Sequence, residues 1–350
     1  MPFAALHLAL ALQITGAPAV EPVAAHREVL VMGTILRGSV EATSHDQAQA
    51  ALERAVAEIE GWERLLSTWD PATPMSVANR APIGIKVPLP STLAALLDEA
   101  LTWSSGTGGA FDPVLGALVD AWDLRGGGRT PDEVELREAL ARSGTGTFGI
   151  DGRTGTLTRL SPGAWIDTGA FGKGAALRAA GSALRPFEVT RGTLDLGGQI
   201  LVVGTDPEPG EVVVAHPRHR THPVARLLLQ PGWSAATSGN SERGIDVDGK
   251  RLGHILDPRT GRPAPDWGSV TVVAADPLVA DILSTALYVM GPDAGLAWAE
   301  ARDDVGALFL VADGDGTVQT LSNRAMNRWL AQPPAGAGSS TTHAPERRIP

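Results

Sequence analysis

The 350-residue sequence contains no cysteine. This absence excludes disulfide bonds, thiolate catalysis, zinc–sulfur sites and a lipid-anchored N-terminal cysteine. Basic residues are in deficit, because 29 Lys and Arg stand against 39 Asp and Glu and give a formal net charge of −10. A surface that follows nucleic-acid phosphates needs the opposite balance, so we expect no nucleic-acid partner. With 43% hydrophobic residues, the chain has ample material for a folded core.

Long apolar runs are also missing. Residues 4–14 are apolar but too few to span a bilayer, and small residues follow at 15–19. The segment is similar to a secretory signal peptide, although no Lys or Arg precedes it. We expect residues 1–20 to be a signal peptide or a disordered N-terminus, with export favoured over a cytoplasmic location. Residues 332–350, rich in Pro, Ala, Gly, Ser and Thr, are expected to be a disordered tail.

The periodicity of apolar residues predicts both helices and strands. Residues 47–66 have apolar side chains at steps of three and four, which predicts an amphipathic helix. A second helix is expected to start with Ser91 as its N-cap and to stop at the glycines of 106–109. A surface helix is expected within 131–143. Strand-like segments occupy residues 29–38, 194–196, 200–203, 212–215, 226–229 and 270–273. Because they show no regular βαβ alternation, the expected fold class is α+β.

Three glycine-rich segments could bring backbone amides close to a ligand. Residues 107–113 could do so, or could be a helix exit held by an Asx turn. Residues 165–174 predict a strand, a turn and a helix whose N-terminus, with Lys173, could hold a phosphate. Asp167 in this segment could accept from a nitrogen-bearing ring or simply cap the turn. Residues 195–204 predict two strands around Gly-Gly, or equally a bulge.

Two further segments are dense in polar side chains. Residues 236–243 and 253–261 contain a group of side chains able to act on a phosphoryl group: Ser238, Arg243, His254, Asp257, Arg259 and Thr260. A lone histidine would usually be structural, and His254 is a candidate because of these neighbours.

The segment 276–291 predicts a helix with Pro277 in its first turn. Asp281 and Thr285 then share one face among apolar neighbours, where an unpartnered polar group would be costly. A hard cation would satisfy both side chains. A hydrogen bond with a neighbouring loop would also satisfy them, and the spacing alone makes that the more common case.

In this order, the segments resemble the ApbE family of FAD:protein FMN transferases over residues 29–329. Residues 32–34 (MGT), 66–70 (LSTWD) and 76–79 (SVAN) add to the resemblance. It implies a mixed α+β domain over 27–331, with two lobes and FAD in the cleft between them.

The resemblance also implies site residues. It places the catalytic histidine at His254. It places the Mg²⁺ ligands at the Asp281 and Thr285 side chains and at the Ala170 carbonyl; another acidic position of the family falls on Leu278, which leaves more of the cation to water. Flavin-contacting positions fall on Met32, Trp69, Ala110, Phe111, Asp112, Asp167, Lys173 and Leu256. Trp69 stands where Tyr is common in the family, which preserves ring stacking.

The implied activity is Mg²⁺-dependent transfer of FMN from FAD to a Thr or Ser hydroxyl of an acceptor flavoprotein, with release of AMP. His254 would manage the proton of that hydroxyl. The alternatives are an FAD pyrophosphatase that yields FMN and AMP, and a non-catalytic FAD-binding carrier. An oxidoreductase has less support, because the sequence lacks a nicotinamide fingerprint and a redox-active cysteine. Without a lipobox cysteine, an exported form would lack an acyl anchor.

Overall fold

The structure is a computed structural model that describes residues 21–240, 244–247, 250–313 and 316–331. The expected signal peptide, the expected C-terminal tail and Arg243 lie outside these residues. The described strands form an eight-stranded antiparallel sheet in the order β1-β2-β6-β7-β10-β15-β16-β17. Its members are β1 (Val23–Val31), β2 (Thr34–Ala42), β6 (Arg191–Leu196), β7 (Gln199–Gly204), β10 (Ser234–Gly239), β15 (Gly268–Ala274), β16 (Gly306–Ala312) and β17 (Val318–Ser322).

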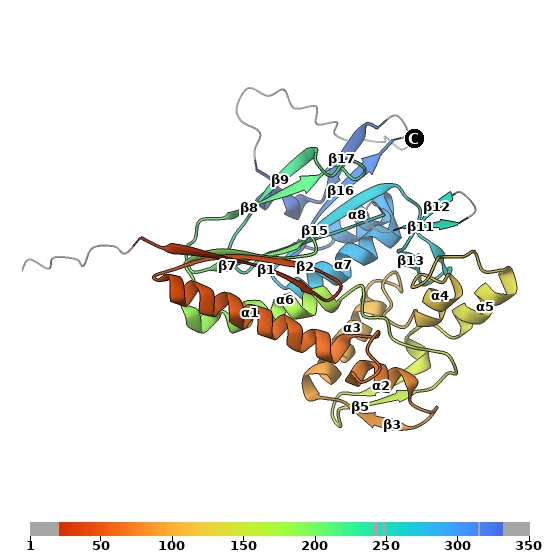
Figure 1. The fold of residues 1–350 in the computed structure, drawn as a ribbon. Coiled ribbons are helices and arrows are strands. Elements are labelled where there is room, and N and C mark those ends of the chain that lie inside the picture. Colours follow the sequence, from red (N-terminus) through yellow and green to blue (C-terminus); the bar gives the residue numbers. More distant parts are fainter. Residues whose placement is uncertain (1–20, 241–243, 248–249, 314–315, 332–350) are drawn as a thin grey trace, which may run out of the picture.

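Helices cover one face of this sheet (Figure 1). They are α1 (His45–Leu66), α6 (Gly172–Ala183), α7 (Pro277–Met290) and α8 (Pro292–Glu300). The opposite face is covered by the hairpin of β8 (Gly210–Ala215) and β9 (Pro223–Leu229) together with the 3₁₀ helix η3 (Arg324–Arg328). The alternation along β7 shows the two layers, because Leu201 and Val203 pack with the α1–α6 core whereas Val202 packs with β8 and β9.

A second group of elements lies below α7 and beside the C-terminal end of α1 (Figure 1). It consists of α2 (Pro74–Arg80), β3 (Lys86–Pro88), α3 (Ser91–Gly106), α4 (Gly116–Ala121), α5 (Glu133–Ala141), η1 (Thr145–Thr147), β4 (Phe148–Asp151) and β5 (Thr156–Arg159). The short remaining elements are η2 (Arg185–Phe187), β11 (Gly244–Val247), β12 (Lys250–Gly253), β13 (Leu256–Asp257) and β14 (Arg262–Pro263). A shared apolar core joins this group to α6 and α7 through Phe111, Phe171 and Ile282.

The α+β prediction is confirmed, and most predicted elements are present. The helix predicted at 47–66 is α1, whose N-cap Ser44 accepts from the Gln47 N–H. The surface helix is α5, which starts with a capping box between Asp132 and Glu135. Residues 195–204 are a hairpin and contain no bulge, because Gly197 and Gly198 take positive φ and make the turn.

Three local predictions were wrong. Ser91 does not cap α3; it is the first helical residue, after Pro90, which makes no side-chain cap. Residues 29–38 are not one strand, because Met32 and Gly33 both have positive φ (52° and 67°) and turn the chain between β1 and β2. Residues 165–167 are not a strand, since their backbone bonds to the Pro113 carbonyl and to the side-chain amide of Asn79 on α2 rather than to a ladder. Among the described residues, no helix is both long and apolar enough to cross a membrane.

Candidate active site

A buried carboxylate joins two helices at the centre of the candidate site. Asp281, on α7, is 4% exposed. Its Oδ1 accepts from Lys173 Nζ at 3.1 Å, and its Oδ2 accepts from the Gly174 N–H at 2.8 Å. Both donors belong to the first turn of α6, where the N-cap Phe171 offers no side-chain acceptor. Asp281 therefore caps α6 from a neighbouring helix and places negative charge where the helix dipole favours it.

Glycine at position 174 makes this contact possible. A Cβ there would lie 2.5 Å from the Pro277 carbonyl oxygen, 2.7 Å from Leu278 Cα and 2.8 Å from Asp281 Cβ. Only glycine lets the backbones of α6 and α7 approach so closely. The sequence pattern that suggested a phosphate-binding helix N-terminus at 165–174 thus contains a helix-packing glycine, and its amide already has an acceptor.

Thr285 and Ala170 are the other two predicted metal ligands. Thr285 lies one turn after Asp281 on α7, is partly exposed, and its hydroxyl makes no hydrogen bond to another described residue. Ser284, in contrast, donates to the Asp281 carbonyl and lies 2.8 Å from Ser238 on β10. Ala170 lies in the turn directly before α6.

This donor set offers one carboxylate, one unpartnered hydroxyl and one carbonyl. Within the described part of the chain, no group of three or more His, Cys, Asp or Glu could hold a metal ion. The set fits a hard cation that keeps most of its water, as Mg²⁺ does. Lys173, which is paired with Asp281, would have to share the carboxylate with that cation.

The aromatic end of the site lies on loops. Trp69 follows α1 and is 71% exposed. The Arg125 guanidinium stacks over its ring at 4.7 Å and over the Trp165 ring at 4.3 Å. Arg125 also donates to Asp167 Oδ1 at 3.1 Å and to the Thr68 carbonyl at 3.2 Å. The structure thus brings Trp69 and Asp167 together through a residue that the sequence reasoning did not select.

The loop 107–113 is held by its own side chains. Ala110 and Phe111 are buried, and Phe111 packs edge-on against Phe171. Asp112 accepts from the Val114 and Thr145 amides and from the Ser104 hydroxyl. Burial raises the pKa of the Asp112 carboxyl above its ordinary value, against these hydrogen bonds. The Asx turn that the sequence left as an alternative is present.

Met32, His254 and Leu256 have different surroundings. The Met32 N–H donates to Glu63 Oε1 at 2.8 Å, and its side chain lies beside Gly172 at the start of α6. His254 is partly exposed in the segment between β12 and β13. Leu256 is buried with Leu118 and other apolar residues next to α4 and α5. Met32 therefore lies at the start of α6, whereas Leu256 belongs to a separate small core.

Asn240 is a second residue that sequence reasoning missed. It is 7% exposed, and both polar atoms of its side chain lack a hydrogen-bond partner in the described structure. The amide fills the space above Gly253, where a Cβ would lie 2.1 to 2.3 Å from it. Buried polar groups are normally hydrogen-bonded. The Asn240 amide, which lies beside the residue that precedes His254, is therefore a candidate contact for a polar ligand. Its only sequence signal was its place in the polar segment 236–243.

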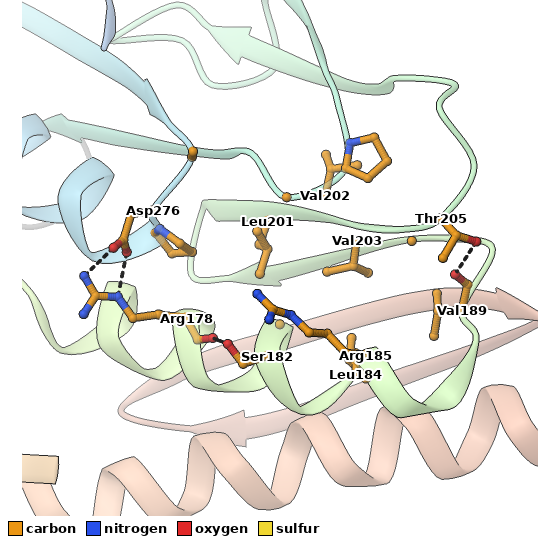
Figure 2. A pocket seen from close by; sticks show the side chains of 16 residues that line it. Arg178, Ser182, Leu184, Arg185, Val189, Leu201, Val202, Val203, Thr205 and Asp276 are labelled. Atoms are coloured by element: carbon orange, nitrogen blue, oxygen red, sulfur yellow. Dashed lines mark hydrogen bonds and ion pairs between the residues drawn. The ribbon is translucent and has the colours of Figure 1, made fainter. Parts of the chain in front are cut away.

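A cavity with a volume of about 520 Å³ lies elsewhere in the described structure. Figure 2 shows it between α6, β7 and the start of α7, with Arg178 bonded to Asp276 on one side and Arg185 beneath Leu201 and Val203. None of the predicted site residues is among those that line it. It therefore does not mark the candidate active site.

Comparison with known proteins shows the family to which the chain belongs. The model of the ApbE family matches residues 32–309. An FAD:protein FMN transferase of Treponema pallidum is 31% identical over 306 residues, covering 82% of this chain and 84% of the relative. The apo form of the flavinyl transferase ApbE of Pseudomonas stutzeri aligns with a TM-score of 0.76 and 27% identity, over 88% of this chain and 96% of that one.

The ApbE protein of Thermotoga maritima aligns with a TM-score of 0.80 and 27% identity, over 89% of this chain and the whole of that one. The fold and the matched segments define an α+β protein of the transferase class. The chain belongs to the ApbE family. The resemblance inferred from the sequence is thereby confirmed.

Proposed function

We propose that the chain is a Mg²⁺-dependent FAD:protein FMN transferase, which moves FMN from FAD to a Thr or Ser hydroxyl of an acceptor flavoprotein and releases AMP. Family membership and the names of its relatives support the reaction class. The observation that carries the proposal is the buried Asp281, which accepts from Lys173 and from the α6 N-terminus. It lies one turn from Thr285, whose hydroxyl makes no hydrogen bond to another described residue.

The chemistry is a displacement at phosphorus. The acceptor oxygen forms a bond to the phosphorus of the FMN half, the phosphoanhydride P–O bond breaks, and AMP leaves with the bridging oxygen. The hydroxyl proton passes to His254, because imidazole is the side chain whose unperturbed pKa lies nearest to neutral pH. Asp281, Thr285 and the Ala170 carbonyl would hold Mg²⁺, which when bound neutralises charge on the pyrophosphate oxygens. Lys173 adds a second positive charge at the same place.

The ring end of the substrate is assigned to the loops. Trp69 offers an exposed indole for stacking, and Asp167 offers a carboxylate within reach of a polar ring edge. Met32 and the backbone of residues 110–112 complete the flavin contacts that the family resemblance implies. The two-lobed arrangement over 27–331 is part of the same proposal. Export of the chain is proposed as well, and N-terminal sequencing of protein recovered from cell fractions would test it.

The test is product analysis with the full chain. The protein is incubated with FAD and Mg²⁺, with and without a threonine-containing acceptor peptide, and products are identified by mass spectrometry. FMN-peptide with equal AMP, lost on addition of EDTA, is the expected result. Free FMN and AMP without peptide modification would make the chain an FAD pyrophosphatase instead, and unchanged bound FAD with every acceptor tried would make it a carrier.

A further inference from the structure

The loop after α4 places one guanidinium at the centre of an aromatic and acidic cluster. Arg125 stacks on both Trp69 and Trp165 and donates to Asp167 and to both oxygens of Thr68. A planar guanidinium that stacks on indoles and donates at its edge is fixed in both position and orientation. A lysine could keep the charge here but could not make this set of contacts.

The residues on one side of Arg125 are themselves rigid. The Trp165 Nε1 donates to Asp120 Oδ2 at 2.8 Å. Its ring fills the space beside Gly116, where a Cβ would lie 2.0 Å from an indole carbon. The loop that carries Arg125 is closed by Asp123, which has a positive φ of 48° and accepts from the Gly127 N–H. Contacts with α4 therefore fix the Trp165 ring, and the Trp165 ring in turn fixes the Arg125 guanidinium.

Trp69, in contrast, depends on Arg125. Its side chain is 71% exposed, and the guanidinium is the only ring or cation partner of its indole among the described residues. The other face of the Trp69 ring is open for a planar ligand to stack on. Because Arg125 already holds the ring, such binding costs no further side-chain conformational entropy. The same guanidinium also orients the Asp167 carboxylate.

We propose that Arg125 is a positioning residue for the isoalloxazine ring of the flavin substrate: it fixes Trp69 as the stacking surface and Asp167 as the polar contact, and it touches no reacting atom. This inference rests on the proposed function, because it takes the planar ligand to be the flavin. It separates the binding of the ring from the binding of the pyrophosphate, which is assigned to Lys173 and Asp281.

The test uses the full-length protein and three variants. Arg125→Met keeps the length of the side chain but removes the stacked, donating plane, and Arg125→Lys keeps the charge. Arg129→Met is the matched control, because Arg129 ends the same loop, is exposed and pairs with Glu135. FAD affinity is measured by quenching of flavin fluorescence, and inhibition of FMN transfer by riboflavin, which has the ring, and by ADP, which has the pyrophosphate.

We expect Arg125→Met to raise the Kd for FAD and the inhibition constant for riboflavin about tenfold, the size of one lost stacking contact. Arg125→Lys should fall between Arg125→Met and the wild type, and it supplies the test if Arg125→Met fails to fold. The inhibition constant for ADP and kcat should stay within about threefold of the wild type. Arg129→Met should leave all four quantities unchanged.

Equal or tighter FAD binding by Arg125→Met would overturn the inference, and tighter binding would mean that Arg125 occupies the place of the ring. Equal losses for riboflavin and ADP would also overturn it, since they would indicate general damage to the site. A wild-type protein that binds FAD but transfers no FMN would refute the proposed function alone, because the FAD affinities would still test Arg125. A wild-type protein that binds no FAD would refute both.

Discussion

Asp281 is 4% exposed and Trp69 is 71% exposed, although both are assigned to the same proposed active site. Asp281 lies between two helices, and each of its oxygens accepts a hydrogen bond from α6. Trp69 lies on a loop, and one side chain holds it in place. The polar end of the site is therefore part of the packed core, whereas the aromatic end rests on surface contacts.

This difference predicts which property each region controls. Changes at the α6–α7 contact should alter stability and chemistry together, because the same atoms serve both. Changes at the Trp69–Arg125 cluster should alter flavin affinity with little effect on folding, since few buried contacts are lost.

Asp281→Asn should have the largest effect. The amide oxygen can still accept from the Gly174 N–H, so the free energy of unfolding should fall by only about 1 kcal/mol, the size of one neutral hydrogen bond. FMN transfer should fall at least about 100-fold, because the negative charge for the cation and for Lys173 is lost. Initial rates over a range of Mg²⁺ concentrations, together with urea unfolding, measure both quantities.

Asp276→Asn is the matched control for that substitution. Asp276 is the N-cap of α7, the helix that carries Asp281, and it pairs with Arg178 outside the site. It should lose stability by about 1 kcal/mol, as a weakened N-cap does, with transfer within about threefold of the wild type. If Asp281→Asn kept wild-type transfer, the carboxylate would be only a helix cap.

Gly174→Ala should have the next largest effect, on stability. The added methyl group would meet the backbone at Pro277 and Leu278, which cannot move without separating the helices. Overpacking should cost about 3 kcal/mol, and the higher helix propensity of alanine should return about 1 kcal/mol. The free energy of unfolding should therefore fall by about 2 kcal/mol. Gly181→Ala on the same helix meets only the flexible end of Leu201 and should be nearly neutral. Equal urea midpoints for the two variants would contradict the close contact.

The elements that the sequence predicted well are those with a local signal. The apolar steps of α1, and the Pro277 start and Asp281–Thr285 spacing of α7, depend on residues within a few turns. The hairpin at Met32–Gly33 was missed because its turn lacks the usual Asn-Gly or Asp-Gly pair. Residue propensities do not predict a positive φ at a methionine such as Met32.

The contacts that build the site are long-range. Lys173 and Asp281 were selected separately, and their pairing spans 108 positions, so no spacing rule could join them. Arg125 sits in a glycine-rich loop with no periodicity of its own, and its partners lie 57 positions before it and 42 after it. Spatial proximity of this kind is set by the tertiary fold, which local pattern does not contain.

Trp69→Ala should weaken FAD binding about tenfold through the lost stacking contact. The free energy of unfolding should change by less than about 0.5 kcal/mol, because an exposed side chain contributes little to packing. Leu30→Ala is the control, since Leu30 is 78% exposed on β1 and belongs to no part of the site. Isothermal titration with FAD measures the affinity. A large loss of stability without a loss of affinity would reverse the division between the two regions.

Asp112→Asn should have the smallest effect, visible only as a pH dependence. Burial raises the pKa of the Asp112 carboxyl above its ordinary value of 3.8, although three donors contact it. Between 3.8 and the folded-state pKa, the folded protein holds a proton that the unfolded chain has lost. The stability from this group is therefore complete below pH 3.8 and declines as pH rises through the folded-state pKa.

Asparagine does not titrate, so the difference in unfolding free energy, wild type minus Asp112→Asn, should fall as pH rises through that window and then stay level. Urea unfolding of both proteins at several pH values between 4 and 7, on the order of one measurement per half unit, resolves the slope. A difference that rises with pH would mean that the hydrogen bonds to the carboxylate outweigh its desolvation. In that case Asp112 would be ionised at lower pH than burial implies, and the loop 107–113 would carry a fixed negative charge beside the site.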